Sequence, residues 1–150
     1  MTHTYTQLLY HLVWSTKERQ PFIAKDFQST LYEYMAGVFR SLKCHCILIG
    51  GMPDHVHVCI EMLPILNISE VMRTVKVSTS KWIRQNFSVG RDFEWQEGYG
   101  AFSVSASNKN ALLQYIKNQE EHHSKYDFRE EFLLLLQKHG VQYDEKYLWK

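Results

Sequence analysis

The chain has 150 residues and an ordinary share of apolar side chains, which predicts one globular domain over residues 1–150. A formal net charge of +1 disfavours the strongly basic proteins that coat nucleic acid, and three cysteines, an odd number, disfavour a disulfide framework. The apolar runs are too short to span a bilayer and the chain opens without a signal-peptide pattern, so we expect a cytoplasmic protein without a membrane partner.

The first third of the chain predicts a strand, a helix and a second strand. Residues 6–15 are rich in β-branched and aromatic side chains, which favours a strand. Asp26 is a suitable N-cap for a helix over residues 26–42, whose apolar residues recur at helical spacing. A second strand follows over residues 43–49, and residues 50–54 contain the glycines and the proline of a turn.

Residues 55–62 predict a third strand because apolar and polar side chains alternate strictly. One face carries Val56, Val58, Ile60 and Met62, and the other carries His55, His57, Cys59 and Glu61. We expect the apolar face to pack beneath helices.

The rest of the chain is predicted to be mainly helical. Asn67 and Glu70 resemble a capping box, which starts a helix that runs to about residue 87. A short strand is expected over residues 90–95 and another strand over residues 99–105. Two helices are expected to follow, over residues 109–125 and 128–139. Asp127 caps the last helix and Gly140 stops it.

The order β-α-β-β-α-β-α-α places the chain in the α+β class. Its first six elements match a ferredoxin-like split βαβ sandwich, in which helices cover one face of an antiparallel sheet. The later helix over residues 109–125 is added to that sandwich. Because this topology supports many unrelated functions, the function must be argued from the site.

His55-Val56-His57 is the most informative local motif. Side chains two positions apart project from the same face of a strand, so the two imidazoles can chelate one divalent ion. His-x-His also occurs by chance, and a metal site therefore requires further ligands nearby.

Tyr115 and Gln119 form a second pair on the helix over residues 109–125. Positions four apart lie on one helical face, so both side chains point in the same direction. The simpler interpretation is a partly buried tyrosine beside a solvated glutamine. A functional interpretation requires this helix to dock on the histidine face of the sheet.

If the helix docks there, the four side chains predict phosphoryl-transfer chemistry. A tyrosine hydroxyl with a pKa of about 10 is a weak nucleophile at neutral pH, and a divalent ion compensates by polarising the scissile phosphate. His55, His57 and the amide oxygen of Gln119 offer three neutral ligands. Attack by Tyr115 leaves a covalent phosphotyrosyl intermediate, which conserves the bond energy and requires no nucleotide cofactor. Tyr126 is the second choice as nucleophile.

Several motifs in this order resemble the HUH single-tyrosine transposases, the TnpA type of the insertion-sequence 200/605 group (IS200-like transposases). The motifs span nearly the whole chain: His11-Leu12-Val13-Trp14-Ser15-Thr16-Lys17, Met52-Pro53-Asp54-His55-Val56-His57, the stretch from Trp95 to Ser105, and Tyr115-Ile116-Lys117-Asn118-Gln119-Glu120-Glu121-His122-His123.

The resemblance implies a DNA transposase with a ferredoxin-like fold that uses Mg²⁺ or Mn²⁺. It implies single-stranded DNA with hairpin ends as substrate, a 5′-phosphotyrosine intermediate and a homodimer. By position, His55 and His57 match the metal-binding pair, Tyr115 the nucleophile and Gln119 the third ligand.

Six basic residues are candidates for contact with the DNA backbone. They are Lys17, Arg19, Arg73, Lys76, Lys81 and Arg84. A solvated helix face is an equally good explanation for the four on the second helix.

Two alternatives remain at the level of sequence. One is a related nickase of single-stranded DNA with a domesticated, repeat-processing role. The other is a non-catalytic ferredoxin-like binding module whose histidines are ordinary polar residues of the sheet.

Overall fold

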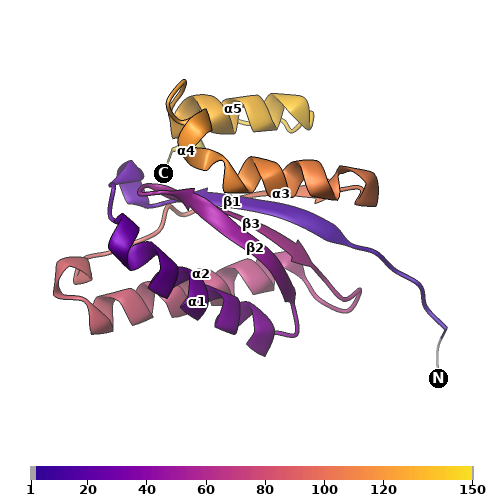
Figure 1. Cartoon of the computed structure of the whole chain (residues 1–150), viewed down its shortest axis with the longest axis horizontal. Coiled ribbons are helices and arrows are strands. Elements are labelled where there is room, and N and C mark those ends of the chain that lie inside the picture. Colours follow the sequence, from indigo (N-terminus) through magenta and orange to yellow (C-terminus); the bar gives the residue numbers. More distant parts are fainter. Residues whose placement is uncertain (1–2, 150) are drawn as a thin grey trace.

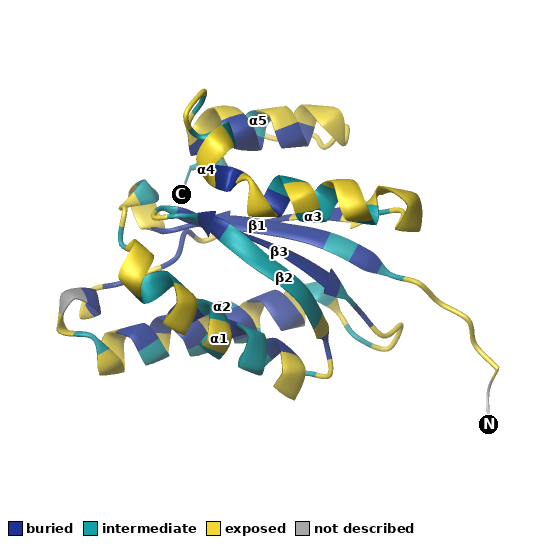
Figure 2. Ribbon diagram, in the orientation of Figure 1, coloured by how far each residue is buried: buried dark blue, intermediate teal, exposed yellow. Residues whose placement is uncertain are grey.

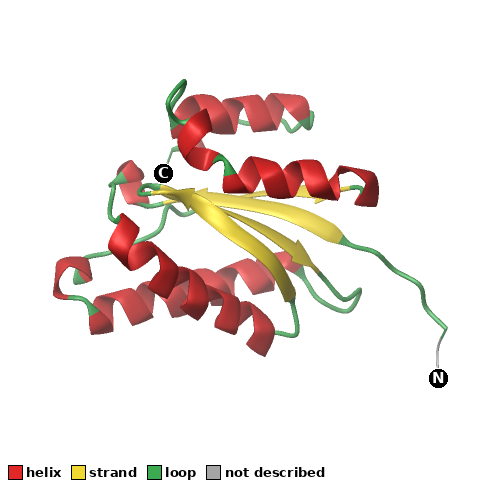
Figure 3. Cartoon of the chain, viewed as in Figure 1, coloured by secondary structure: helices red, strands yellow, loops and turns green. Residues whose placement is uncertain are grey.

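The computed structural model describes residues 3–149, apart from the side chain of residue 89. Four antiparallel strands form one sheet in the order β2-β3-β1-β4. The strands are β1 (Leu9–Ser15), β2 (His45–Met52), β3 (His55–Glu61) and β4 (Gly100–Val104). This order is that of the ferredoxin-like sandwich, so the predicted fold class is confirmed (Figure 3).

Helices cover both faces of the sheet (Figure 1). One face carries α1 (Lys25–Ser41) and α2 (Ile68–Asn86). The opposite face carries α3 (Lys109–Lys117), α4 (Gln119–His122) and α5 (Phe128–Lys138). In Figure 1, α5 lies farther from the sheet than α3, as an outer layer.

Short helical elements complete the chain. They are the 3-10 helices η1 (Lys17–Arg19), η2 (Ser88–Gly90) and η3 (Ala106–Asn108), and the last helix α6 (Glu145–Leu148). None of the helices in residues 3–149 combines the length and apolar character needed to cross a bilayer.

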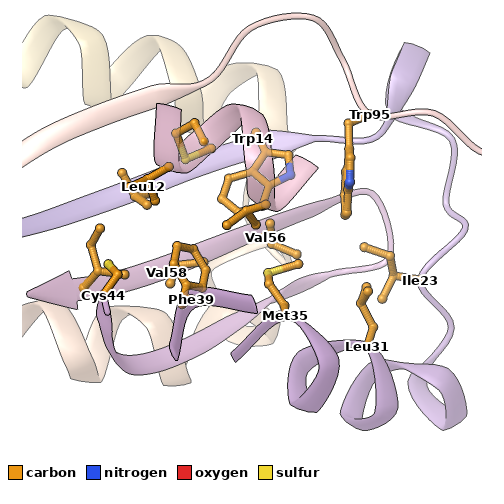
Figure 4. Packing of buried hydrophobic residues seen from close by; sticks show 14 of the residues in the cluster. Leu12, Trp14, Ile23, Leu31, Met35, Phe39, Cys44, Val56, Val58 and Trp95 are labelled. Carbon is orange, nitrogen blue, oxygen red and sulfur yellow. The ribbon is translucent and has the colours of Figure 1, made fainter. Parts of the chain in front are cut away.

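The main core fills the space between the sheet and the helices α1 and α2 (Figure 4). The alternation in β3 directs Val56 and Val58 into this core, where they meet Leu12 and Trp14 of β1. These side chains are fully buried, and the apolar stripe of α1 packs against them. The predicted division of β3 into an apolar and a histidine face is therefore correct.

A second, smaller core lies on the other face of the sheet. It contains Val13, Phe102, Phe128, Phe132, Leu135 and Leu136. Because α5 supplies the last four of these residues, this small core is what holds α5 on the protein. Strand β3 is consequently buried on both faces (Figure 2).

Several predicted boundaries are confirmed and others are wrong. Asn67 accepts hydrogen bonds from the backbone N–H groups of α2, and Asp127 does the same for α5. By contrast, α1 begins at Lys25 behind Ala24, so Asp26 lies in its first turn instead of capping it.

Strand β2 extends through residues that the sequence assigned to a turn. Gly50 pairs with His57, and Gly51 pairs with Val56. Hydrogen bonding to a well-formed neighbouring strand outweighs the low strand preference of glycine. The short strand expected over residues 90–95 is reduced to a single bridge between Trp95 and Thr16.

The helix expected over residues 109–125 is interrupted at Asn118. Its backbone angles, φ −98° and ψ 28°, are those of a turn, which asparagine tolerates well. The chain therefore changes direction between α3, which carries Tyr115, and α4, which begins with Gln119.

Candidate active site

The two histidines of β3 lie under the helices α3, α4 and α5. Each has an exposed fraction of 0%, and both Nε2 atoms point toward the same carboxylate, that of Glu131. Their position follows from the register of the sheet, because His57 pairs with Val13 of the central strand β1. The central strands thus hold the two imidazoles firmly.

His55 is oriented by an acidic neighbour. Its Nδ1 lies 2.7 Å from Oδ1 of Asp54, in the turn before β3. In the neutral ring, donation from Nδ1 to this carboxylate leaves the lone pair of Nε2 free to bind a cation. Burial alone would lower the pKa of His55, but hydrogen bonds with Asp54 and Glu131 outweigh it and raise the pKa to about 9.

His57 is oriented by another histidine. Its Nδ1 lies 2.7 Å from Nε2 of His11 on β1, and the two rings stack with centroids 5.0 Å apart. Burial lowers the pKa of both imidazoles, so both are neutral at physiological pH. Without metal, the single N–H of neutral His57 is on Nε2 and donates to Glu131; when Nδ1 instead donates to His11, Nε2 presents a lone pair to a cation.

The structure brings Gln119 and Tyr115 to the histidines, as the functional interpretation of the sequence requires. Oε1 of Gln119 lies 2.9 Å from Nε2 of His55. The ring centroid of Tyr115 lies 5.6 Å from that of His57. Although the helix breaks at Asn118, the two side chains still point into one site.

A fifth residue, Glu131 of α5, lies at the centre of the site and was missed from the sequence. Oε1 is 3.0 Å from Nε2 of His57 and 3.2 Å from Nε2 of His55. Oε2 accepts hydrogen bonds from the Tyr115 hydroxyl and, at 3.1 Å, from Nε2 of Gln119. The exposed fraction of Glu131 is 1%.

The sequence does contain a signal for Glu131. Phe128, Phe132 and Leu135 mark the apolar stripe of α5, and Glu131 lies three residues after the first and four before the last. A carboxylate within the buried stripe of a helix is costly unless it is paired. It therefore indicates a buried partner of opposite or complementary charge.

Burial and charge move the pKa values of this centre in opposite directions. Burial alone would raise the pKa of Glu131, but hydrogen bonds from His123, His55 and His57 lower it strongly, so the carboxyl group is ionised. Burial, and then the negative charge of Glu131, raise the pKa of Tyr115. The tyrosine is therefore protonated in this arrangement.

The two histidines that follow Gln119 also contribute. The ring of His122 stacks on Tyr115 with centroids 4.5 Å apart. Nε2 of His123 lies 3.0 Å from Oε1 of Glu131 and 3.2 Å from Oε1 of Gln119. His123 thus adds a third imidazole to the centre.

The donor atoms fit a divalent cation. One ligand atom from each of His55, His57 and Glu131 lies within 4.8 Å of the others, the one such group among the described residues. Ligand atoms about 2.1 Å from an octahedral ion lie about 3.0 Å from their neighbours. The separations of 2.9–3.2 Å between the histidine nitrogens and the oxygens of Gln119 and Glu131 match this spacing.

A groove of about 840 Å³ lies between α2, η1 and the segment over residues 94–99. Four of the six candidate DNA-contact residues line it: Lys17, Arg73, Lys76 and Arg84. Arg19 and Lys81 are not among its lining residues. The histidines, Tyr115 and Gln119 do not line this groove; a hydrogen bond from the backbone N–H of Thr16, the residue before Lys17, to the carbonyl of Asp54 connects the two regions.

Three of the basic side chains in the groove also have structural partners. The ammonium group of Lys76 donates to the carbonyls of Gln96, Glu97 and Gly98, and burial lowers its pKa to about 8. Lys17 pairs with Glu94, and Arg84 donates to the carbonyl of Phe93. Arg73 is exposed.

Comparison with known proteins places this geometry in context. The sequence model of one family, described as Transposase IS200 like, matches residues 4–119. The ISDra2 transposase TnpA of Deinococcus radiodurans is 22% identical over 122 residues, which are 77% of this chain and 86% of that protein.

Two solved structures share the fold. One, from Deinococcus radiodurans R1 and described as a candidate transposase, has a TM-score of 0.65 at 22% identity and covers 79% of this chain and 95% of its own. The other, a REP-associated tyrosine transposase bound to a REP hairpin, has a TM-score of 0.61 at 13% identity and covers 82% of this chain and 73% of its own.

Proposed function

From the premise that the chain belongs to the family of IS200-like transposases, we propose that it cleaves and rejoins single-stranded DNA through a 5′-phosphotyrosine at Tyr115. The observation that carries the proposal is that the Tyr115 hydroxyl and the imidazoles of His55 and His57 all contact one carboxylate, that of Glu131. Elements far apart in the sequence supply these groups.

His55, His57 and the amide oxygen of Gln119 would hold Mg²⁺ or Mn²⁺. When bound, the ion neutralises charge on the scissile phosphate and makes the phosphorus a better electrophile. Asp54 contacts Nδ1 of His55, and His11 contacts Nδ1 of His57. These contacts would keep the Nε2 lone pair of each imidazole directed at the ion.

Tyr115 supplies the nucleophile. A bond forms between its oxygen and the phosphorus, and the bond from phosphorus to the 3′ oxygen breaks. The tyrosine proton leaves, and the departing 3′ oxygen takes up a proton to become a free hydroxyl. Rejoining reverses these changes with another 3′ hydroxyl, so no nucleotide cofactor is consumed.

The groove between α2 and residues 94–99, whose lining holds four basic and three acidic side chains, is the path we propose for the DNA. Lys17, Arg73 and Arg84 line it, and Tyr99 and Trp95 offer aromatic surface. We propose that a hairpin end of the substrate lies here and leads a single strand past the end of β1 to His55. Two copies of the chain are expected to act as a homodimer.

A covalent-adduct assay tests the nucleophile. The protein is incubated with labelled single-stranded DNA that carries the hairpin flanking its gene, with Mn²⁺, and analysed on a denaturing gel. We expect an adduct that is lost in Tyr115→Phe and with chelator. Tyr126→Phe is the matched control and retains the adduct.

The outcome also separates the alternatives. Joining of the cleaved strand to a second labelled end distinguishes a transposase from a nickase. Absence of any adduct in the wild-type protein, or an adduct that survives Tyr115→Phe, contradicts the proposal. Adduct formation with double-stranded DNA to the same extent as with single-stranded DNA would also contradict the proposal.

A further inference from the structure

The carboxylate of Glu131 makes the contacts that a DNA phosphate must make in the reaction. We propose that Glu131 occupies the place of the scissile phosphate while DNA is absent, and that α5 moves out when DNA binds. This inference rests on the proposed function, because it assigns the occupant of the same site.

The two oxygens of the Glu131 carboxylate contact different parts of the site. Oε1 lies 3.0 Å from Nε2 of His57 and 3.2 Å from Nε2 of His55, the nitrogens that would bind the cation. Oε2 accepts a hydrogen bond from the hydroxyl of Tyr115. A scissile phosphate must likewise place one oxygen on the cation and its phosphorus within reach of Tyr115. The carboxylate therefore resembles the substrate group in charge and in both contacts.

The metal-binding side of the site is closed while α5 is in place, whereas Tyr115 lines a cavity of about 290 Å³ beside it. His55 and His57 are fully buried, Gln119 has an exposed fraction of 2%, and Glu131 one of 1%. A phosphodiester carries a nucleoside on each side, so it cannot enter a space from which water is excluded. The helix that carries Glu131 must therefore move before a strand of DNA reaches the histidines.

The distances lead to the same conclusion. Oε1 of Glu131 already lies 3.0–3.2 Å from Nε2 of His55, His57 and His123. A phosphate oxygen cannot occupy the same position, and a phosphate group beside the carboxylate would be repelled as a like charge. Glu131 and the scissile phosphate therefore exclude each other.

The architecture allows α5 to move without unfolding the domain. It packs on the small core around Phe128 and Phe132, which is separate from the main core beneath α1 and α2. The contact of α5 with the last residues is also local: the guanidinium groups of Arg19 and Arg129 lie 5.4 and 4.8 Å from the ring centroid of Trp149.

The test measures access of a phosphodiester to bound Mn²⁺, with dimethyl phosphate as the probe. Phosphorus that binds directly to Mn²⁺ loses its ³¹P signal by paramagnetic broadening. With wild-type protein we expect little broadening beyond that caused by free Mn²⁺. With Glu131→Ala we expect dimethyl phosphate to bind at least about tenfold more tightly, since the competing charge is gone.

Glu130→Ala is the matched control, because Glu130 is exposed on the same helix and loses the same atoms. It should behave like the wild type. If Glu131→Ala fails to fold by circular dichroism, Glu131→Gln removes only the charge and should shift affinity in the same direction.

Each outcome decides the inference. Strong broadening with wild-type protein, or equal broadening with wild type and Glu131→Ala, overturns it while the metal site stands. If wild-type protein binds no Mn²⁺, or if His57→Gln binds it as tightly as wild type, the proposed metal site fails and the inference fails with it.

Discussion

The two histidines of β3 share a strand and a face, yet they differ in charge. His55 has a pKa of about 9 because Asp54 and Glu131 stabilise its proton against the effect of burial. His57 has a neutral imidazole, His11, on its other nitrogen, and burial keeps its pKa low. The neighbour on Nδ1 therefore decides the resting state of each ring.

This difference predicts how stability depends on pH without bound metal. The pKa of His55 is raised from 6.5 to about 9, so its contribution is complete below pH 6.5 and is lost as the pH rises through 9. In the presence of chelator, we expect the melting temperature of wild-type protein to fall toward that of His55→Gln between pH 6.5 and 9.5. A constant difference between the two proteins across this range would contradict the assignment.

At the level of elements, the position of the nucleophile depends on how closely α3 approaches β2. An added Cβ at Gly50 would lie 2.6 Å from the carbonyl oxygen of Ile116 and 2.7 Å from its Cγ2. Ile116 follows Tyr115 directly on α3. Gly50 is therefore required for the contact that presents Tyr115 to the sheet.

Gly50→Ala should destabilise the protein by roughly 1–3 kcal/mol, since a backbone carbonyl yields little to a new methyl group. It should also reduce adduct formation, because α3 is pushed away from the histidines. Gly37→Ala is the control: no atom lies within 4 Å of the added carbon, and alanine in a helix interior stabilises by roughly 0.5–1 kcal/mol. Denaturant unfolding measures both changes, and wild-type stability in Gly50→Ala would refute the close contact.

At the level of the whole molecule, the sheet separates two cores of different size. The main core joins β1 and β3 to α1 and α2, whereas the smaller core joins the opposite face to α5. Side chains that bind the proposed cation come from β3 and α4, between these two layers. Such a division lets one layer open while the other stays folded.

Hydrogen exchange should reveal this division directly. In the DNA-free protein, we expect the amides of α5 to exchange at least about tenfold faster than those of β3, because a local opening exposes them. Mass spectrometry of peptides from residues 128–138 and 55–61 makes the comparison. Equal protection of both segments would mean that the molecule opens only as a whole.

The local geometry of the site could be predicted from the sequence. Strand alternation placed His55 and His57 on one face, and helical spacing placed Tyr115 near Gln119. These relations depend only on backbone periodicity over a few residues. For the same reason, the element order was sufficient to predict the ferredoxin-like sheet, although the ends of β2 and the break at Asn118 were missed.

Only the tertiary structure decided what fills the centre of the site. Glu131 meets His57 across 74 positions of sequence, and that contact depends on how α5 crosses the sheet. No periodicity relates such distant residues, because packing between separate elements sets their distance. The sequence alone determined which side chains face the same way, and the packing of the helices on the sheet determined which of them meet.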